Sequence, residues 1–393
     1  MNRVVGLDVS RGRVSVCLLS ELPDNPKNWF RANREKIIDI LPNKEGIDTL
    51  LNLEPTHAVL EPTGIHYARL WADYLHHAGV KVLWVGHSQL CATRKAYRLP
   101  GKNDQADALA LACYGLAHLG EPEYFLRFDL WSEAYEIRQY CLEIQHLERR
   151  TVPIKNRLRQ QLSHEWPEIA EVKTKGALWK FLAGRDLPKA ARTRYSHLAA
   201  NSVGFGCSEF TRFQADQLCD IEDQIKAIEQ KLVALTGKPE FHKYRAVLSQ
   251  FGFGPRIEGL LLAHIYPFEN FLGPNNREII EFVSRDRRRT KRNRSLKSFK
   301  LFLGFGLVED SSGKSEGWVP GGSQLCRNAI WQHIFTKIEP KGSRPKSAIG
   351  QELGRYCDSL KASRLNPKLV RSKVGVKLVE KLYQALLLTL CEG

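Results

Sequence analysis

VVGLDVSRGRVSVCLL, residues 4–19, opens the chain with two apolar runs joined by the short Arg11–Gly12 segment. Short apolar runs on either side of a glycine-containing turn are typical of a β-hairpin. We therefore expect strands over residues 3–9 and 13–19 that pair antiparallel. The first run carries one carboxylate, Asp8, in otherwise apolar surroundings.

The segments that follow predict an alternation of helices and strands. Helices are expected near 44–53 and 64–79, and buried strands are expected at 57–61 and 80–85. A third strand, placed around Trp29–Ala32, completes the order strand, strand, strand, helix, strand, helix, strand, helix. An RNase H-like sheet has this order. It places one carboxylate on the first strand, one on the fourth, and one or two on the last helix.

Four carboxylates occupy these positions: Asp8 in VVGLDVS, Glu61 in THAVLEPTG, and Asp104 and Asp107 in KNDQADALALA. The last two are three residues apart in a helical pattern, so they share one helix face. Converging carboxylates repel unless a cation lies between them, and oxygen ligands with room for phosphates suit Mg²⁺ or Mn²⁺. Two such ions could clamp the attacking and leaving oxygens of a phosphodiester. The alternative is a local role for each residue, in a turn, at a strand end, or at a helix N-terminus favoured by the helix dipole.

Length and charge indicate a multidomain protein with a polyanionic partner. The 393 residues exceed one typical core, which predicts two or three domains. The net charge is +16 and the isoelectric point is near 9.4, so nucleic acid or an anionic membrane surface is the expected partner. Residues 1–120 hold 14 Lys and Arg against 12 Asp and Glu, whereas the remainder holds 45 against 31. The excess positive charge therefore lies outside the carboxylate region.

The sequence contains no stretch that approaches the roughly 18 to 20 apolar residues of a membrane span, and it starts with a strand pattern instead of a leader. We expect a soluble, unexported protein that is cytoplasmic and associated with the nucleoid. The nine cysteines are scattered without CxxC or CxxxxC spacing, so the sequence indicates neither a zinc site nor a disulfide framework.

The middle of the chain predicts two long helices. Apolar residues at helical spacing run through 131–168, interrupted only by Pro153, and again through 213–235. We expect a helical pair or coiled coil, a type that often dimerises, around an irregular insert at 170–206. The alternative is two amphipathic helices on a single core. The expected domains are 1–125, 126–240 and 241–393.

Two features of the last third could contact DNA. The segment VLSQFGFGPRIEGLLLAHI resembles a helix-hairpin-helix, in which Gly252 and Gly254 expose backbone N–H groups to a phosphate. The run SRDRRRTKRNRSLKSFK, residues 284–300, holds nine Lys and Arg against one acid, and we expect a flexible or nucleic-acid-ordered loop. The alternatives are a purely structural turn and a solvated charge run. The candidate phosphate contacts in the run are Arg287, Arg288, Arg289, Lys291, Arg292 and Arg294.

The run is followed by a serine-rich segment, GFGLVEDSSGKSEGWVPGGSQLCRNAIWQHIF, which predicts a Ser-Gly turn, a Gly-Gly turn and a helix from near Leu325. A serine on an exposed turn can be a nucleophile when a base or metal activates it and cations stabilise the transition state. Ser312 is the preferred candidate because it directly precedes Gly313. Ser311 and Ser315 compete with it, and an ordinary loop serine is the alternative.

Taken in order, GLDVS, LEPTG followed by Tyr67, KNDQADALALA, the FGFGP turn, and GFGLVEDSSG with Gly322 and Arg327 resemble the DEDD transposases of the insertion sequence 110 family. This family is related to Piv-type DNA invertases. The resemblance covers roughly residues 3–120 and 244–391 and leaves the middle as a helical linker. The chain departs from the family pattern at Asn103 and at Val308–Glu309, and the basic run resembles an insertion.

The resemblance implies a DNA transposase or recombinase of an insertion sequence. Its RuvC-like domain would bind Mg²⁺ or Mn²⁺ through the four carboxylates, and its mostly helical transposase domain would supply Ser312 to form a covalent DNA intermediate. A structured bridge RNA would pair with donor and target DNA, and a homodimer or homotetramer would unite the acidic site of one subunit with the serine of another. Lys102 and Arg327 would contact phosphate, or else be ordinary surface charges.

Two other functions stay open. A RuvC-like structure-specific nuclease would hydrolyse DNA with water and make no use of the serine. A catalytically inactive, domesticated nucleic-acid-binding protein would keep the fold and the charge without the chemistry. An actin-like ATPase also uses a similar first strand, but the sequence shows no second glycine-rich phosphate loop at the required distance.

Overall fold

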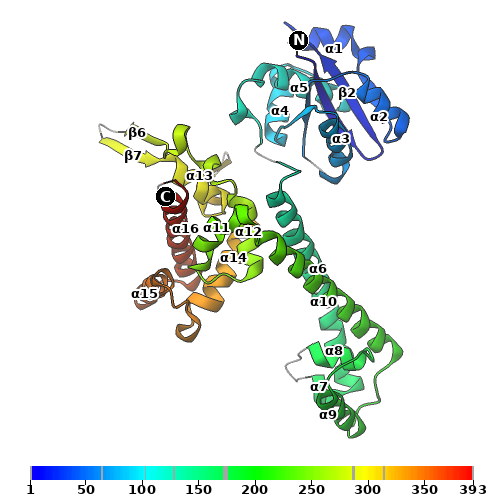
Figure 1. Cartoon of the computed structure of the whole chain (residues 1–393), viewed down its shortest axis with the longest axis vertical. Helices are drawn as coiled ribbons and strands as arrows, with labels where there is room; N and C mark the ends of the chain where they lie inside the picture. The colour runs from blue at the N-terminus through cyan, green and yellow to red at the C-terminus, as the bar shows by residue number, and fades with distance from the viewer. Residues whose placement is uncertain are drawn as a thin grey trace. The chain divides into compact units, whose positions relative to one another are not determined.

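A computed structural model describes residues 2–62, 65–101, 103–126, 129–170, 176–285, 288–312 and 315–391. The chain forms two compact units, Met1–Asp129 and Leu130–Gly393 (Figure 1). The first is a mixed α/β unit, and the second is mostly helical with two β-hairpins. This confirms the expected succession of an α/β part and a helical part. Within the described residues, no helix has the length and apolar character needed to span a bilayer.

The first unit is built on one five-stranded sheet of order β3-β2-β1-β4-β5. Strand β1 pairs antiparallel with β2 and parallel with β4, and β5 continues the parallel side. This is the order and direction expected for an RNase H-like sheet. The opening hairpin is as predicted, and Gly12 takes a positive φ of 84° in its turn. The strands are β1 Val4–Ser10, β2 Arg13–Leu19, β3 Ile38–Ile40, β4 His57–Leu60 and β5 Lys81–Trp84.

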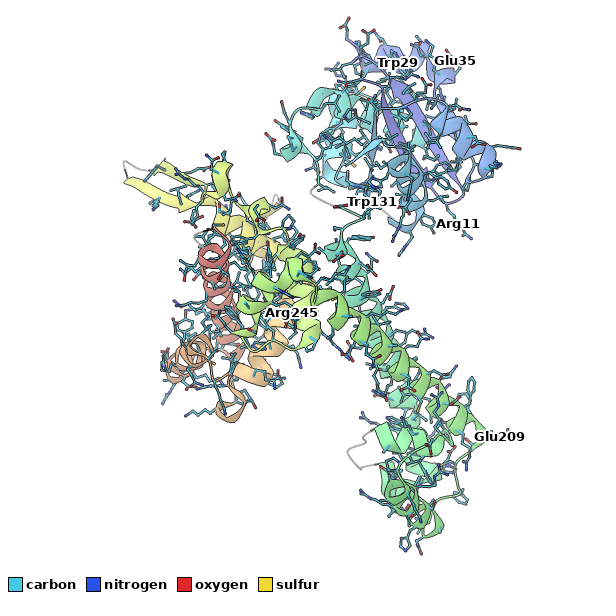
Figure 2. All side chains as sticks on the ribbon, in the orientation of Figure 1. Arg11, Trp29, Glu35, Trp131, Glu209 and Arg245 are labelled. Carbon is cyan, nitrogen blue, oxygen red and sulfur yellow. The ribbon has the colours of Figure 1, made fainter. Side chains whose placement is uncertain are left out.

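The helices of this unit correct two expectations. Residues 29–32 are not a strand but part of helix α1, on which Trp29 lies (Figure 2). Asn25 caps that helix and Pro26 occupies its first turn, a start signal that outweighs the apolar run. Helix α4 was not expected at all. The helices are α1 Pro26–Ala32, α2 Lys44–Leu51, α3 Ile65–His77, α4 His87–Ala96 and α5 Asp104–His118, with 3₁₀ turns at Arg34–Lys36 and Pro122–Tyr124.

Helix α5 lies directly against the sheet because small residues meet at the contact. A Cβ atom added to Gly6 of β1 would lie 2.1 Å from the carbonyl oxygen of Ala108 and 2.4 Å from the amide nitrogen of Ala112. A Cβ atom on Gly115 would lie 2.5 Å from a methyl group of Val59 on β4. The Ala- and Gly-rich face of α5 therefore sets its distance from β1. It also fixes where the first turn of α5 sits.

Gly6→Ala should lower the free energy of unfolding of the first unit by about 3 kcal/mol, because backbone atoms on α5 cannot move aside as a side chain could. Gly101→Ala is the matched control, since a Cβ atom there meets nothing within 4 Å. Thermal and urea unfolding, followed by circular dichroism, measure the difference between the two variants. Equal stabilities would contradict this account of the contact.

The second unit begins with the two long helices that the sequence predicted, α6 Glu133–Glu165 and α10 Glu209–Thr236. They pack against each other within the chain, and α6 continues through Pro153 without ending. Their facing residues are buried, among them Ile144, Ile225 and Leu232. Arg256 of α12 (Pro255–Ile265) forms ion pairs with Glu148 of α6 and Glu229 of α10, which ties the pair to the rest of the unit.

The insert at 170–206 is helical, not irregular as expected. Three short helices, α7 Pro167–Ala170, α8 Gly176–Leu182 and α9 Lys189–Ala200, follow α6. With the adjoining ends of α6 and α10 they enclose a small core of their own that includes Trp166 and Trp179. Glycine and proline divide this sequence into pieces too short for clear helical periodicity.

The predicted helix-hairpin-helix segment consists of α11 His242–Ser249 and α12, joined by a short turn. Gly252 has a φ of 70° in this turn, and Gly254 is the N-cap residue of α12. Both helices contribute to a large core that also contains the C-terminal helix α16. The last helices are α14 Gln324–His333, continued by a π-helical turn Ile334–Ile338, then α15 Ala348–Ala362 and α16 Pro367–Cys391. Short 3₁₀ turns lie at Pro239–Phe241, Phe268–Phe271, Pro274–Asn276 and Lys341–Ser343.

Two antiparallel hairpins complete this unit. The first consists of β6 Ile280–Arg285 and β7 Arg288–Asn293, followed by helix α13 Arg294–Phe302. The basic run is therefore a hairpin and a helix, not the expected loop. Its charges concealed the strand pattern, which begins four residues earlier at Ile280. The second hairpin consists of β8 Gly306–Ser312 and β9 Ser315–Gly321. All nine cysteines are free thiols.

Candidate active site

Asp8 and Glu61 lie side by side at one edge of the sheet. In the parallel pairing of β1 and β4, Leu7 is opposite Leu60. Asp8 and Glu61 are the next residues, so each lies just beyond the last residue that pairs β1 with β4. The strand pairing alone thus brings together two carboxylates that are 53 residues apart in the sequence.

The first turn of α5 carries the other two carboxylates, Asp104 and Asp107. Asn103 is the N-cap residue, and its side chain accepts a hydrogen bond from the Ala106 N–H at 3.0 Å. The close contact of α5 with Gly6 brings this turn toward the end of β1. The positive end of the helix dipole favours acidic residues here.

Electrostatics show that the four carboxylates are near one another. The pKa of Asp8 is raised to about 7, first by burial and then by the negative charges of Asp107, Asp104 and Glu61. Burial also raises the pKa of Asp107, whereas its contact with Arg94 lowers it. Carboxylates repel one another in this way only when they lie closer together than about a Debye length. The site therefore concentrates negative charge that a cation would stabilise.

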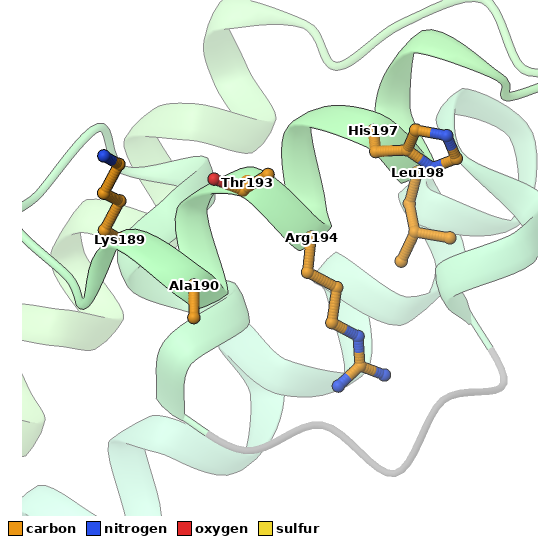
Figure 3. Close-up of a pocket in the computed structure, with 6 residues that line it drawn as sticks. All are labelled: Lys189, Ala190, Thr193, Arg194, His197 and Leu198. Atoms are coloured by element: carbon orange, nitrogen blue, oxygen red, sulfur yellow. The ribbon is translucent and has the colours of Figure 1, made fainter.

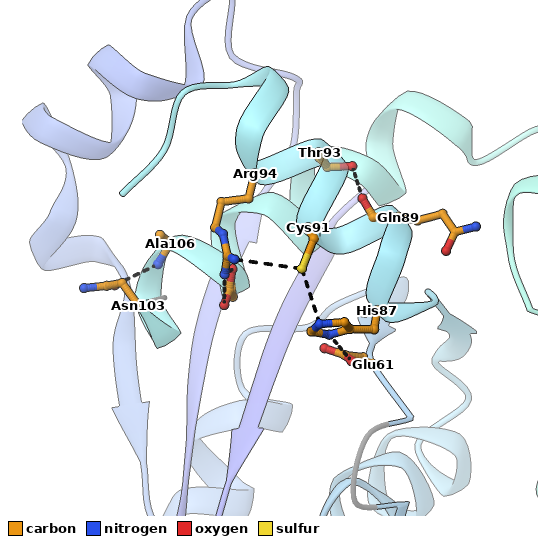
Figure 4. A network of polar contacts seen from close by, with 9 residues as sticks. Glu61, His87, Gln89, Cys91, Thr93, Arg94, Asn103 and Ala106 are labelled. Carbon is orange, nitrogen blue, oxygen red and sulfur yellow. Dashed lines mark hydrogen bonds and ion pairs between the residues drawn. The ribbon is translucent and has the colours of Figure 1, made fainter. Parts of the chain in front are cut away.

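Two arginines partly balance this charge, and a histidine makes a hydrogen-bond contact with one of the carboxylates. Arg94 donates through Nη1 to Oδ1 and Oδ2 of Asp107 at 2.6 and 2.7 Å. His87 Nδ1 lies 2.9 Å from Glu61 Oε1 (Figure 4). Arg13 Nη2 lies 3.7 Å from Asp104 Oδ2 at a more exposed position. The Arg94 pair is the most enclosed of the three, with side chains only 17% and 13% exposed.

The sequence prediction missed His87 and Arg94 because it missed α4, which carries both. Only Leu90 is buried in that helix, so it shows no apolar periodicity. Cys91 lies between them, with Sγ 3.4 Å from His87 Nε2 and 3.9 Å from Arg94 Nη2 (Figure 4). A usable signal was the presence of basic residues directly after β5, since a carboxylate cluster needs nearby cations.

The donor set suits a hard divalent cation in its chemistry, because it consists of carboxylate oxygens from several elements. Among the described residues, however, no three His, Cys, Asp or Glu side chains are already grouped to hold one ion. Both oxygens of Asp107 are instead engaged by Arg94. The four carboxylates have the ligand chemistry that such an ion needs. The side chain of Asp107 would have to rearrange to bind it.

The predicted nucleophile lies in the second unit, on the β8–β9 hairpin. Ser312 is the last residue of β8 and pairs with Ser315 across a two-residue connection, and Ser311 precedes it. Their side chains are outside the described part of the structure. A different serine has a defined environment: Ser323 caps α14, and its Oγ lies 3.3 Å from His264 Nε2. Burial lowers the pKa of His264 to about 4, so this imidazole is neutral.

The other predicted contacts have varied surroundings. Arg327 donates to the Gly304 carbonyl at 3.1 Å and to Gln324 at 2.8 Å, which gives it a structural role. Arg294 pairs with Glu281 at 2.6 Å. Lys291 and Arg292 are exposed on β7. Lys102 and Arg287 lie outside the described residues, as do the side chains of Arg288 and Arg289.

A surface hollow of about 860 Å³ lies along α9 (Figure 3). Its lining is Lys189, Ala190, Thr193, Arg194, His197 and Leu198. No carboxylate lines it, so it is a different place from the acidic cluster.

Comparison with known proteins finds a similarity for the first part of the chain. Residues 5–167 match the family model of the DEDD transposases of insertion sequence 110, described as "Transposase". No curated protein matches the chain. A structural match is T. thermophilus RuvC in complex with Holliday junction substrate, at 15% identity and a TM-score of 0.23, covering 32% of this chain and 100% of that one. Residues 5–167 of this chain are therefore similar to the DEDD transposases of the insertion sequence 110 family.

Proposed function

We propose that the protein is a recombinase that moves an insertion sequence by joining DNA strands through a serine-linked intermediate. The observation that carries the proposal is the gathering of Asp8 on β1, Glu61 directly after β4, and Asp104 and Asp107 on α5, with the pKa of Asp8 raised to about 7. The family match over residues 5–167 supports DNA as the substrate. Carboxylates so arranged are suited to phosphodiester chemistry and not to apolar ligands.

The proposed reaction is a pair of transesterifications. Ser312 Oγ forms a bond to phosphorus while the bond from phosphorus to one deoxyribose oxygen breaks. The serine proton leaves to a base, and the departing oxygen gains a proton. A deoxyribose hydroxyl of the second DNA then attacks the same phosphorus and releases the serine. One P–O bond forms and one breaks in each step, so no water or nucleotide cofactor is consumed.

The four carboxylates would hold Mg²⁺ or Mn²⁺, which would supply Lewis-acid stabilisation of the charge that develops on the phosphate oxygens. Arg94 holds Asp107 oriented in the absence of the ion. His87 holds Glu61, and Asn103 fixes the start of the helix that bears Asp104 and Asp107. These neighbours keep mutually repelling groups in place before the cation binds.

The proposed partners are donor and target DNA, a structured bridge RNA that pairs with both, and further copies of the chain. The carboxylates and Ser312 lie in different compact units, which suits an assembly in which subunits exchange these parts. A homodimer or homotetramer would provide two such composite sites. Acting on DNA would place the protein in the cytoplasm at the nucleoid.

The test is to trap the covalent intermediate. Purified protein, its element's flanking RNA, donor DNA, target DNA and Mg²⁺ are combined, denatured and resolved on a denaturing gel. The recombinase should give joined strands and a protein–DNA adduct that survives denaturation. Hydrolysed ends without an adduct would favour the nuclease. Salt-sensitive binding with neither product would favour the inactive nucleic-acid-binding protein.

Arg94→Gln should tighten Mn²⁺ binding by about tenfold, because Asp107 loses the cation that competes with the ion. A tenfold change in affinity corresponds to a free energy comparable with that of one charge-assisted hydrogen bond. Manganese electron paramagnetic resonance titration gives the affinity without any reaction. Lys95→Gln is the matched control, since it removes one exposed charge from the same helix without touching Asp107. Weaker or unchanged binding in Arg94→Gln would contradict the competition.

A further inference from the structure

The β6–β7 hairpin is a narrow two-stranded ribbon with a fixed base. Six residue pairs join the strands. At the base, the Ile279 N–H donates to Oγ of the buried Ser295 at 2.9 Å, and the Arg294 N–H donates to the Ile279 carbonyl at 2.8 Å. Figure 1 shows the ribbon at the edge of its unit, beyond α13. These bonds fix the direction in which the ribbon leaves the helices.

The charge of the ribbon is positive and accessible. Lys291 and Arg292 are exposed, and within the described part of the chain neither forms an ion pair. Glu281 is opposite Arg292 in the register, but its Oε2 is 2.6 Å from Nε of Arg294, so its charge is neutralised at the base. Thr290 beside them is exposed and uncharged. Among the described residues, the ribbon thus offers two cations, Lys291 and Arg292, that form no ion pair.

An exposed aromatic side chain accompanies these cations. Phe282 is 57% exposed and is directly opposite Lys291 in the strand pairing. Cross-strand partners project from the same face of a ribbon. One face therefore carries an apolar group next to an ammonium group. This combination suits a partner whose surface has phosphates beside apolar base edges.

We infer that this ribbon binds in the major groove of B-form duplex DNA. Two strands about 4.7–4.9 Å apart, with their side chains, match a groove about 12 Å wide that admits a two-stranded ribbon. Phe282 and Lys291 share the face that meets the base edges, where Phe282 contacts a thymine methyl group, and Arg292 projects from the opposite face. The long side chains of Lys291 and Arg292 reach the phosphates at the walls of the groove. The major groove of A-form RNA is too deep and narrow for side chains to read, so duplex DNA is the partner. The inference rests on DNA as the proposed partner, but it requires no chemistry at the carboxylates, so its test is separate from that of the proposed reaction.

Binding is measured by fluorescence anisotropy in EDTA, where strand chemistry does not occur. The Lys291→Ala, Arg292→Ala double variant should bind duplex DNA about tenfold more weakly, and the slope of log affinity against log salt should shrink by about 2. A Lys36→Ala, Lys44→Ala double variant removes equal charge from exposed positions in the first unit and is the control. Lys291→Arg, Arg292→Lys should restore the slope. Circular dichroism confirms that all variants fold.

The groove is identified with dimethyl sulfate, which methylates guanine N7 in the major groove and adenine N3 in the minor groove. The wild-type protein should protect guanine N7, and the double alanine variant should lose this protection. Protection of adenine N3 alone would overturn the inference. So would an unchanged salt slope, or tighter binding to duplex RNA of the same sequence.

The role of Phe282 is tested separately, by removing the thymine methyl group from the DNA. Substituting uracil for thymine in the DNA should weaken binding by wild-type protein by about threefold, the value of one partly buried methyl group. Phe282→Ala should bind more weakly with an unchanged salt slope, and it should not distinguish uracil from thymine. If Phe282→Ala still distinguished them, the contact would lie elsewhere.

Discussion

Ser312→Ala should yield no covalent protein–DNA adduct and should reduce strand joining by at least roughly 10³-fold, because the nucleophile that splits the reaction into two steps is gone. DNA binding should be unchanged, since a β-hairpin end loses only one hydroxyl group. Denaturing gels of radiolabelled DNA report the adduct and the joined product, and anisotropy reports the binding.

Three further variants decide which serine reacts. Ser311→Ala and Ser315→Ala flank the same connection and should retain the adduct. Ser323→Ala removes the hydroxyl near His264 and a helix cap, at a cost of about 1 kcal/mol in stability, but it should also retain the adduct. An adduct that persists in Ser312→Ala and disappears in one of the other three would reassign the nucleophile. If the adduct persisted in all four variants, serine would have no part in the mechanism.

The positions of the carboxylates follow from strand geometry that the sequence reveals. Apolar runs ending at Asp8 and Glu61 predict two buried strands, and buried neighbouring strands in an alternating α/β order are parallel. Residues just past such strand ends lie at one edge of the sheet. The Asp104 and Asp107 spacing places both on one helix face. Composition and periodicity are enough to propose this neighbourhood.

The counter-ions could not be found in the same way. Arg94 belongs to a helix with one buried residue, so hydrophobic periodicity has no signal there. Its contact with Asp107 depends on the tertiary packing of α4 against α5, which sequence spacing does not encode. The β6–β7 ribbon was missed for a related reason. No residue of β6 or β7 that the structure describes is buried, and the run of cations resembles a solvated loop.

Asp8→Asn should abolish strand joining, by at least roughly 10³-fold, and at the same time stabilise the protein when no divalent ion is present. The loss of activity follows because the amide removes the carboxylate charge at the centre of the cluster. The gain in stability follows because burial, and after it the charges of Asp107, Asp104 and Glu61, raise the pKa of Asp8 to about 7 from 3.8. The folded state therefore tolerates protonated Asp8 better than ionised Asp8.

The sign of the pH dependence follows from this shift. Between the ordinary pKa of an aspartate and about pH 7, the folded state binds more protons than the unfolded state, so stability falls as the pH rises through this window. The full shift would correspond to about 4 kcal/mol, but solvent screening at this partly exposed group reduces the effect to the order of 2 kcal/mol. Asp8→Asn should exceed wild type in Tm at about pH 8 and differ little in acid near the ordinary aspartate pKa.

Divalent ions provide the decisive comparison for Asp8. Mg²⁺ or Mn²⁺ binds the folded state and not the unfolded chain, so it should raise the Tm of wild type with concentration. It should raise the Tm of Asp8→Asn much less, and the advantage of the variant at about pH 8 should shrink or reverse.

Asp39→Asn is the matched control, because Asp39 is an acid on β3 of the same sheet whose Oδ1 accepts a hydrogen bond from Ser15 at 2.5 Å. If Asp8→Asn were less stable than wild type without metal, the carboxylates would not be repelling one another. If the ion stabilised both proteins equally, Asp8 would not be one of its ligands.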